Sequence, residues 1–178
     1  MRFLTLFLFI AFKSFAQDFT AITTKTDTYK RINSAEKLAE KIEKDFSSDE
    51  DKVKAIFCWL TSNISYDLEE YYNPSSRRKS FRYRTEEEKE QILQAIKDET
   101  VLETITTKKS VCEGYAQTFT KVCTLLNIES EVISGYARFG YQEIGKPQPN
   151  SNHAWNAVKI NNEWLYFCLL YTSDAADD

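Results

Sequence analysis

The chain has 178 residues, and its 23 basic and 27 acidic side chains give a net charge of −4. A hydrophobic content of 42%, with 14% aromatic residues, is too high for a disordered chain and sufficient for one compact domain. The slight acidity gives no electrostatic basis for a nucleic-acid partner. The single histidine excludes chemistry that needs two imidazoles, including most zinc sites.

The first 16 residues have the pattern of a secretory signal. An apolar run from Phe3 to Phe12 follows Arg2, and it is too short to cross a bilayer. Ser14 and Ala16 have the spacing that signal peptidase accepts. We therefore expect residues 1–16 to be removed, leaving an exported protein, periplasmic or extracellular, without stable membrane insertion. A hydrophobic N-terminal strand is the alternative interpretation.

The end of the sequence, CLLYTSDAADD, finishes in a stretch without apolar periodicity. The whole string resembles the translation of a sequencing adapter. We interpret residues 168–178 as a non-native tail and the gene as truncated just after Phe167. A genuine short acidic tail is the alternative.

Between these ends the chain is predicted to form helices first and strands afterwards. Residues 17–32 are polar and are expected to be an extended lead-in. Helical periodicity then indicates helices that begin at Asn33, at Ser47-Ser48, at Thr85 and after Ser110. The third should be the shorter one, preceded by a basic aromatic loop over residues 71–84. The fourth has a wide apolar face and should be central.

The periodicity changes to two after the fourth helix, which is typical of strands. Strands are predicted over residues 129–138, 154–160 and 163–167, with a tight hairpin at Asn161-Asn162 because asparagine tolerates positive φ. Helices followed by strands in one run predict a single α+β domain over residues 33–167.

Four cysteines in an exported chain first suggest disulfides. Helix geometry opposes one pairing, because Cys112 and Cys123 would lie about 16 Å apart on the same helix and a disulfide requires Cα atoms within about 7 Å. Cys58, between aromatic neighbours, fits a small buried thiol. No CxxC pair occurs, so a metal site is not predicted, and we expect no cofactor.

Cys112 lies in the string KSVCEGYAQTF, at the first turn of a helix that Ser110 is predicted to cap. The N–H groups and positive dipole end at that position stabilise a thiolate, which is the usual way a cysteine becomes nucleophilic near neutral pH. Glu113 opposes this effect. A buried, inert cysteine is the alternative.

His153 opens a predicted strand in the string NHAWNAV, after a loop that contains proline and glycine. An imidazole has the right pKa to hold the proton of a nucleophilic thiol. With the turn at Asn161-Asn162, positions 153 and 168 become diagonal neighbours on one face of the sheet. A carboxylate at position 168 would orient the imidazole, but this chain has Cys168 there.

Taken together, these strings resemble the transglutaminase-like superfamily, especially its secreted bacterial members and its kyphoscoliosis-peptidase-like branch. The resemblance covers roughly residues 50–167 and includes the upstream string CWLTSNISYD. It implies a papain-like α+β core with a Cys–His–Asp triad in which Cys112 is the nucleophile and His153 the general base. The triad aspartate of the family falls on position 168, so it is missing here.

The resemblance implies an exported cysteine enzyme that acts on amide bonds of a protein or peptide substrate through a thioester. Hydrolysis, as a peptidase or amidase, is the first interpretation, and crosslinking of glutamine to lysine is the second. An inactive binding or scaffold domain is the third, and the missing aspartate gives it weight. The backbone N–H of Cys112 is the predicted oxyanion donor, with Tyr66 as a second donor. Tyr115 and Trp155 are predicted to shape the site, or else to be core aromatics.

Overall fold

The computed structural model describes residues 19–74, 81–138, 141, 145–146 and 150–169. The predicted signal, residues 1–16, and positions 170–178 of the predicted tail lie outside them. The elements are, in chain order, α1 (Thr20–Thr26), α2 (Ala35–Asp45), α3 (Asp49–Asn63), β1 (Ser65–Tyr66), α4 (Leu68–Tyr72), α5 (Glu86–Thr107), β2 (Lys109–Ser110), α6 (Cys112–Leu125), β3 (Ser130–Gly135), β4 (His153–Ile160) and β5 (Glu163–Phe167).

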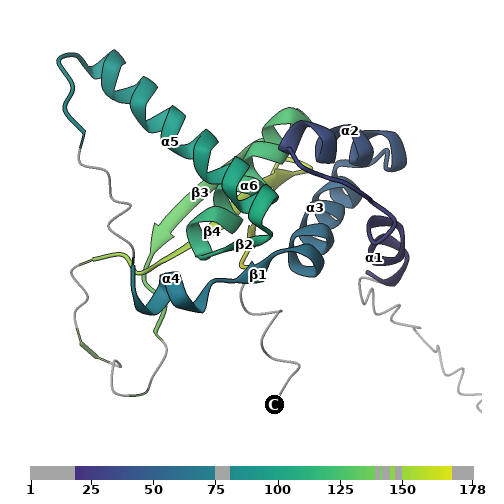
Figure 1. The fold of residues 1–178 in the computed structure, drawn as a ribbon. Helices are drawn as coiled ribbons and strands as arrows, with labels where there is room; N and C mark the ends of the chain where they lie inside the picture. The colour runs from purple at the N-terminus through teal and green to yellow at the C-terminus, as the bar shows by residue number, and fades with distance from the viewer. Residues whose placement is uncertain (1–18, 75–80, 139–140, 142–144, 147–149, 170–178) are drawn as a thin grey trace, which may run out of the picture.

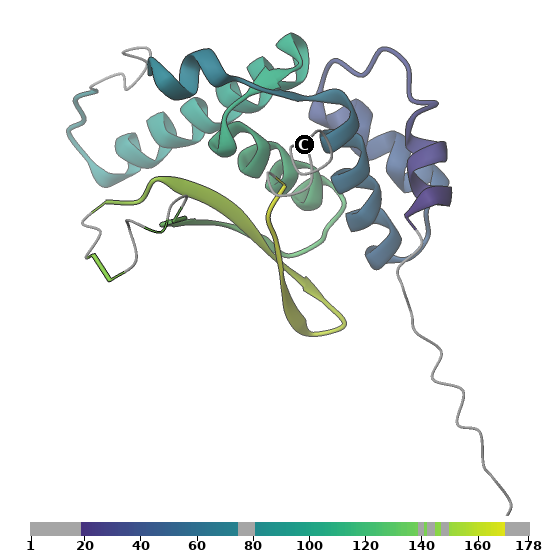
Figure 2. The same ribbon diagram turned by 90° about the horizontal axis from the view of Figure 1, so that it is seen from below.

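Helices and sheet form two layers. Figures 1 and 2 show the helices on one side of the antiparallel sheet, whose strand order is β3-β4-β5. The helix α6 packs against β3 and β4 on one side and against α2, α3 and α5 on the others. This arrangement is the predicted α+β fold, and the helix that starts with Cys112 is central, as its apolar face indicated.

The core explains why α6 takes this position. Phe119, Val122 and Cys123 on α6 are fully buried, and they join the buried face of α3 and Val158 of β4 in one hydrophobic cluster. Burial of a large apolar side chain contributes about 1.5–3 kcal/mol. A helix with several such residues is therefore held firmly in the middle of the domain.

The N-terminal segment differs from its prediction. The lead-in over residues 17–32 was predicted to be extended, but Thr20–Thr26 form α1. Ile22 is buried, and Phe19 lies against Phe57 of α3 with ring centroids 6.0 Å apart. The prediction was wrong because these tertiary contacts stabilise a helix that the polar local sequence does not indicate.

The predicted helix starts are close to the observed ones. Ser34, rather than Asn33, caps α2, and its hydroxyl accepts from the N–H of Lys37. Ser48 caps α3 as predicted. Such caps satisfy an N–H group that has no partner within the helix.

The helix α5 was predicted to be short, yet it extends over 22 residues. Thr85 caps it as predicted, through the N–H of Glu88. Its buried residues, Val101, Thr104 and Ile105, belong to the C-terminal half, while the N-terminal half extends away from the domain in Figure 1. The prediction stopped too early because it followed the apolar residues Ile92, Leu93 and Ile96, and the half that it missed is stabilised by packing on α6.

The β4–β5 hairpin follows its prediction closely. Ile160 pairs with Glu163, and the two turn residues, Asn161 and Asn162, have φ of 52° and 67°. These values belong to the left-handed region that a two-residue type I′ turn requires and that asparagine tolerates. The turn therefore sets the register of β5 against β4 down to the pair Asn156↔Phe167.

None of the helices in the described ranges combines the length and the apolar character needed to cross a membrane.

We expect Asn162→Ala to lower the free energy of unfolding by about 1 kcal/mol, because a left-handed conformation costs alanine roughly 1–2 kcal/mol. The measurement is the urea midpoint at unchanged slope. Asn162→Gly is the matched control and should be at least as stable as the parent, since glycine adopts positive φ freely. An alanine variant with the parent's midpoint would show that the left-handed conformation at position 162 does not contribute to stability.

Candidate active site

Two short strands place Tyr66 next to the start of α6. The strand β1 pairs in parallel with β2, with Tyr66 opposite Ser110. The N–H of Asp67 donates to the Ser110 carbonyl at 2.9 Å, and the N–H of Ser65 donates to the Lys108 carbonyl at 2.9 Å. Because α6 begins two residues after Ser110, this pairing fixes Tyr66 beside Cys112.

The first turn of α6 fits tightly against the end of α5. The hydroxyl of Thr104 donates to Ser110 Oγ at 3.1 Å. A Cβ added to Gly114 would overlap both of these hydroxyl groups. Glycine at position 114 is therefore required for the first turn to lie this close, and it restricts where the Cys112 sulfur can be. The N-cap is Val111, and its side chain makes no capping hydrogen bond with the described residues, so the predicted Ser110 cap was wrong.

Cys112 is the first residue of α6, and its side chain is partly buried. Its sulfur accepts hydrogen bonds from the backbone N–H groups of Ala154 and Glu113. Burial nevertheless raises the pKa of the Cys112 thiol, and the Glu113 carboxylate adds to that rise. The expected stabilisation of a thiolate by the helix start is outweighed. The resting sulfur is a neutral thiol that needs a base.

Asn156 connects β4 to α6. Its side chain is fully buried, and Nδ2 donates to the Ala116 carbonyl at 2.9 Å and to Thr120 Oγ1 at 2.9 Å. A buried amide without partners would cost about 1–3 kcal/mol, so these bonds fix the position of the strand along the helix. Asn156 therefore places the N-terminal end of β4, with Ala154, against the Cys112 sulfur.

His153 is the first residue of β4, and only 7% of its surface is exposed. Its Nε2 lies 3.3 Å from Cys168 Sγ, and its ring centroid lies 5.9 Å from that of Trp155. The predicted proximity of positions 153 and 168 is therefore confirmed. Burial lowers the pKa of the His153 imidazole, so the ring is neutral near pH 7 and able to accept a proton.

Tyr66 is half-buried, and its hydroxyl accepts a hydrogen bond from the backbone N–H of Cys112. Burial, followed by the nearby Cys112 sulfur, raises the pKa of Tyr66, which therefore keeps its proton. Tyr115 is buried in the core, and its hydroxyl donates to the Ile64 carbonyl just before β1. Tyr115 is thus a core aromatic residue, which was the alternative interpretation, and its hydrogen bond holds the chain just before β1.

Trp155 lies at the edge of the candidate site, two residues after His153 on β4. Its side chain is half-buried, and its six-membered ring occupies the space that a Cβ on Gly135 would take. Gly135 pairs with His153 across the sheet, so the indole of Trp155 covers the β3 side of the histidine strand. The structure thus brings the Cys112 sulfur, Tyr66 and the strand that carries His153 and Trp155 to one place, at the N-terminal end of α6.

The chain matches one protein family over most of its length. The model of the family described as "Transglutaminase-like superfamily" matches residues 36–167. The chain belongs to the transglutaminase-like superfamily.

Curated relatives from this superfamily include the kyphoscoliosis peptidases of Mus musculus and Homo sapiens. They are 31% and 30% identical to the chain over 118 residues. The alignments cover 66% of this chain but only 15% of each relative, so the chain spans a small part of their length. Among solved structures, "Crystal structure of a TGase" superposes with a TM-score of 0.51 at 18% identity, covering 96% of this chain and 36% of that one. This similarity confirms the fold.

Three features of the candidate site were not predicted from the sequence. One is the Ala154 N–H, since a backbone donor leaves no trace in a sequence. The second is Asn156, for which a polar residue among the apolar ones of NHAWNAV was an available signal. The third is Tyr71 of α4, whose ring centroid lies 5.9 Å from that of Tyr66. Tyr71 was assigned to the predicted loop over residues 71–84, but α4 extends to Tyr72.

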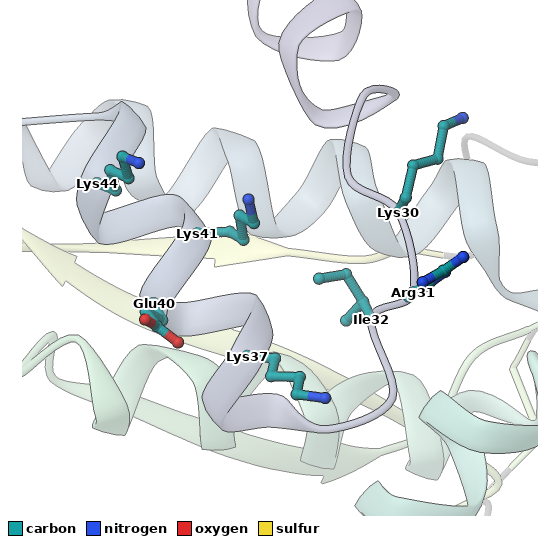
Figure 3. A pocket seen from close by; sticks show the side chains of 7 residues that line it. All are labelled: Lys30, Arg31, Ile32, Lys37, Glu40, Lys41 and Lys44. Atoms are coloured by element: carbon teal, nitrogen blue, oxygen red, sulfur yellow. The ribbon is translucent and has the colours of Figure 1, made fainter.

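Other clusters do not extend this site. None of the four cysteines forms a disulfide within the described structure, and no group of three potential metal-binding side chains is found in that part of the chain. A hollow of about 380 Å³ lies between α2 and the segment before it (Figure 3), and no predicted site residue lines it. Its lining is mostly basic and consists of Lys30, Arg31, Ile32, Lys37, Glu40, Lys41 and Lys44.

We expect the rate at which iodoacetamide alkylates Cys112 to increase with pH and to be still rising above about pH 9. The reason is that the reactive thiolate forms only as the pH passes the pKa of Cys112, which burial raises. The measurement is the mass-spectrometric rate for the Cys112 peptide across the pH range. A rate that is already constant below about pH 7 would instead indicate a preformed thiolate–imidazolium pair.

Proposed function

We propose that this transglutaminase-like domain acts on amide bonds of a protein or peptide through a thioester on Cys112. The observation that carries the proposal is the hydrogen bond from the Ala154 N–H to the Cys112 sulfur. It puts the sulfur against the strand that begins with the only histidine of the chain. A partly exposed thiol and a neutral imidazole on adjacent elements are what general-base activation of a nucleophile requires.

The proposed reaction has two halves. His153 takes the thiol proton while the Cys112 sulfur attacks the amide carbonyl carbon and forms a sulfur–carbon bond. As the tetrahedral intermediate collapses, the carbon–nitrogen bond breaks, and His153 returns the proton to the leaving amine. The contact with Cys168 involves Nε2, so we assign the proton transfer to Nδ1. Water then attacks the thioester, His153 takes and returns its proton, and the acid leaves from a restored thiol.

Tyr66 has a role in the same proposal. Its hydroxyl is protonated and lies beside the Cys112 backbone N–H. The oxyanion of each tetrahedral intermediate needs donors at this position. The Tyr66 O–H is able to donate directly, while the Cys112 N–H must exchange its bond to the Tyr66 oxygen for one to the oxyanion. Tyr66 is therefore proposed as the second oxyanion donor, with the backbone N–H of Cys112 as the first.

Hydrolysis is the proposed outcome, as a peptidase or amidase. The first 16 residues support export to a periplasmic or extracellular location. In such surroundings water is far more abundant than acceptor amines. Transfer to a lysine amine is the competing outcome, which the same thioester permits. A nucleic-acid partner is not proposed.

A second candidate function is that of an inactive binding or scaffold domain. The observation in its favour is the thiol of Cys168 at 3.3 Å from His153 Nε2, where the family resemblance places an aspartate. A thiol is a weak acceptor, so it orients the imidazole less firmly than a carboxylate does. The two candidates differ in the reactivity of Cys112.

Alkylation by iodoacetamide tests this difference at neutral pH. We expect Cys112 to react faster than Cys58 and Cys123, which are buried, and His153→Ala to slow Cys112 at least tenfold through loss of the base. Burial raises the pKa of Cys123 to about 12, so it serves as an inert internal reference. Labelling of Cys112 no faster than that of Cys58, or unaffected by His153→Ala, would favour the inactive domain.

Addition of a fluorescent primary amine to a glutamine-containing peptide substrate separates the two enzymatic outcomes. Release of free acid without incorporation of the amine supports hydrolysis, while incorporation of the amine at glutamine indicates crosslinking.

We expect Cys168→Asp to increase the neutral-pH alkylation rate of Cys112 by about tenfold, the effect of one pKa unit. A carboxylate beside Nε2 favours the imidazolium and raises the pKa of His153, which strengthens it as a base for the thiol. Cys168→Ser is the matched control, since it removes the sulfur without adding a charge. An aspartate variant that reacts no faster than the serine variant would show that position 168 does not act on the imidazole.

A further inference from the structure

Three exposed apolar side chains lie on α4, next to the candidate nucleophile. Leu68 is 57% exposed, Tyr71 41% and Tyr72 73%. The helix has five residues, and none of them is buried. The domain core therefore does not account for these side chains, and exposed apolar patches of this kind usually mark contact with a ligand or another chain.

The patch is continuous with the site through a row of rings. The Tyr72 and Tyr71 centroids are 5.1 Å apart in an edge-to-face arrangement, and the Tyr71 and Tyr66 centroids are 5.9 Å apart. Both distances are typical of favourable aromatic pairs. The row ends at the Tyr66 hydroxyl, which is bonded to the backbone of Cys112. The three tyrosines thus form a path of aromatic surface from solvent to the reacting sulfur.

The patch is also fixed relative to the sulfur. Asp67 caps α4 by accepting from the N–H of Glu70 at 3.0 Å. Its carboxylate pairs with Lys109 at 3.1 Å, and its N–H donates to the Ser110 carbonyl. Lys109 and Ser110 are the residues of β2 that lead into Cys112. The helix is therefore anchored to the same segment that positions the nucleophile.

We propose that Leu68, Tyr71 and Tyr72 form a subsite for an aromatic side chain of the polypeptide substrate, next to the amide bond that Cys112 attacks. This inference rests on the proposed function. The occupant is assigned as substrate because the rings lead directly to the sulfur. Stacking gives such a subsite a preference of about three- to tenfold for an aromatic over a small side chain.

Two chloromethyl ketones that differ only in the side chain test the subsite. Acetyl-phenylalanine and acetyl-alanine chloromethyl ketone each alkylate Cys112 by the same step. A bond forms between the sulfur and the methylene carbon, chloride leaves with the bonding electrons, and the thiol proton passes to His153. We expect the phenylalanine reagent to react about tenfold faster in the parent chain, and Tyr72→Ala to lower this ratio about threefold.

Two further variants make the result specific. Tyr72→Phe should keep the ratio, because the ring and not the hydroxyl supplies the contact. Tyr166→Ala is matched in exposure, at 72% against 73% for Tyr72. It lies on β5 next to Phe167, which packs on the core, so by strand alternation Tyr166 points away from the helices. The ratio should be unchanged in this control.

The outcomes separate this subsite from the proposed function. If Cys112 reacts readily with iodoacetamide but the ratio is near one, or does not change in Tyr72→Ala, the subsite is wrong and the proposed function stands. If none of the three reagents labels Cys112 ahead of Cys58, both are wrong. A ratio that falls in Tyr72→Ala but not in Tyr72→Phe or Tyr166→Ala supports the subsite.

Discussion

The position of β4 along α6 determines which groups meet in the candidate site. The Asn156 amide donates to a backbone carbonyl and to a threonine hydroxyl of α6, and the Ala154 N–H donates to the Cys112 sulfur. A slip of the strand by one residue would turn its side chains to the opposite face and leave the buried amide without partners. The Cys112 sulfur and the strand that carries His153 therefore meet because these hydrogen bonds fix β4 at one position along α6.

Burial, rather than the helix dipole, sets the resting state of the sulfur. A helix terminus contributes typically 0.3–1 kcal/mol to a nearby charge, and one pKa unit corresponds to about 1.4 kcal/mol. Loss of hydration shifts a buried group by up to several units. Desolvation is accordingly the largest effect on both Cys112 and His153, and it keeps both neutral. In the proposed reaction the thiol is therefore activated by proton transfer to His153, and not by a thiolate stored beforehand.

Local patterns predicted the parts of this structure that depend on local physics. The Asn161-Asn162 turn gave the register of β5 and with it the proximity of His153 and Cys168, because a two-residue turn leaves little freedom. The Ser48 and Thr85 caps were read correctly for the same reason. The family strings then identified Cys112 and His153 as a pair.

What the sequence did not predict depends on contacts between distant segments. The helix α1 forms because Ile22 and Phe19 pack on α3, and the polar sequence around them carries no sign of it. The raised pKa of Cys112 follows from burial of its sulfur in the folded chain, which a rule based on the helix terminus alone omits. Tyr71 lies beside Tyr66 because Asp67 turns the chain into α4, within a stretch that was predicted to be a loop.

The most direct measurement uses the fact that the chain has one histidine. A single pair of imidazole carbon-bound proton signals belongs to His153, and their pH titration by nuclear magnetic resonance needs no assignment. We expect a pKa of His153 below the ordinary value, as burial requires, and a clear change in the chemical shift and the pKa of His153 when Cys112 is replaced by alanine. A titration that is identical with and without the Cys112 sulfur would mean that His153 and Cys112 do not interact and do not form a catalytic pair.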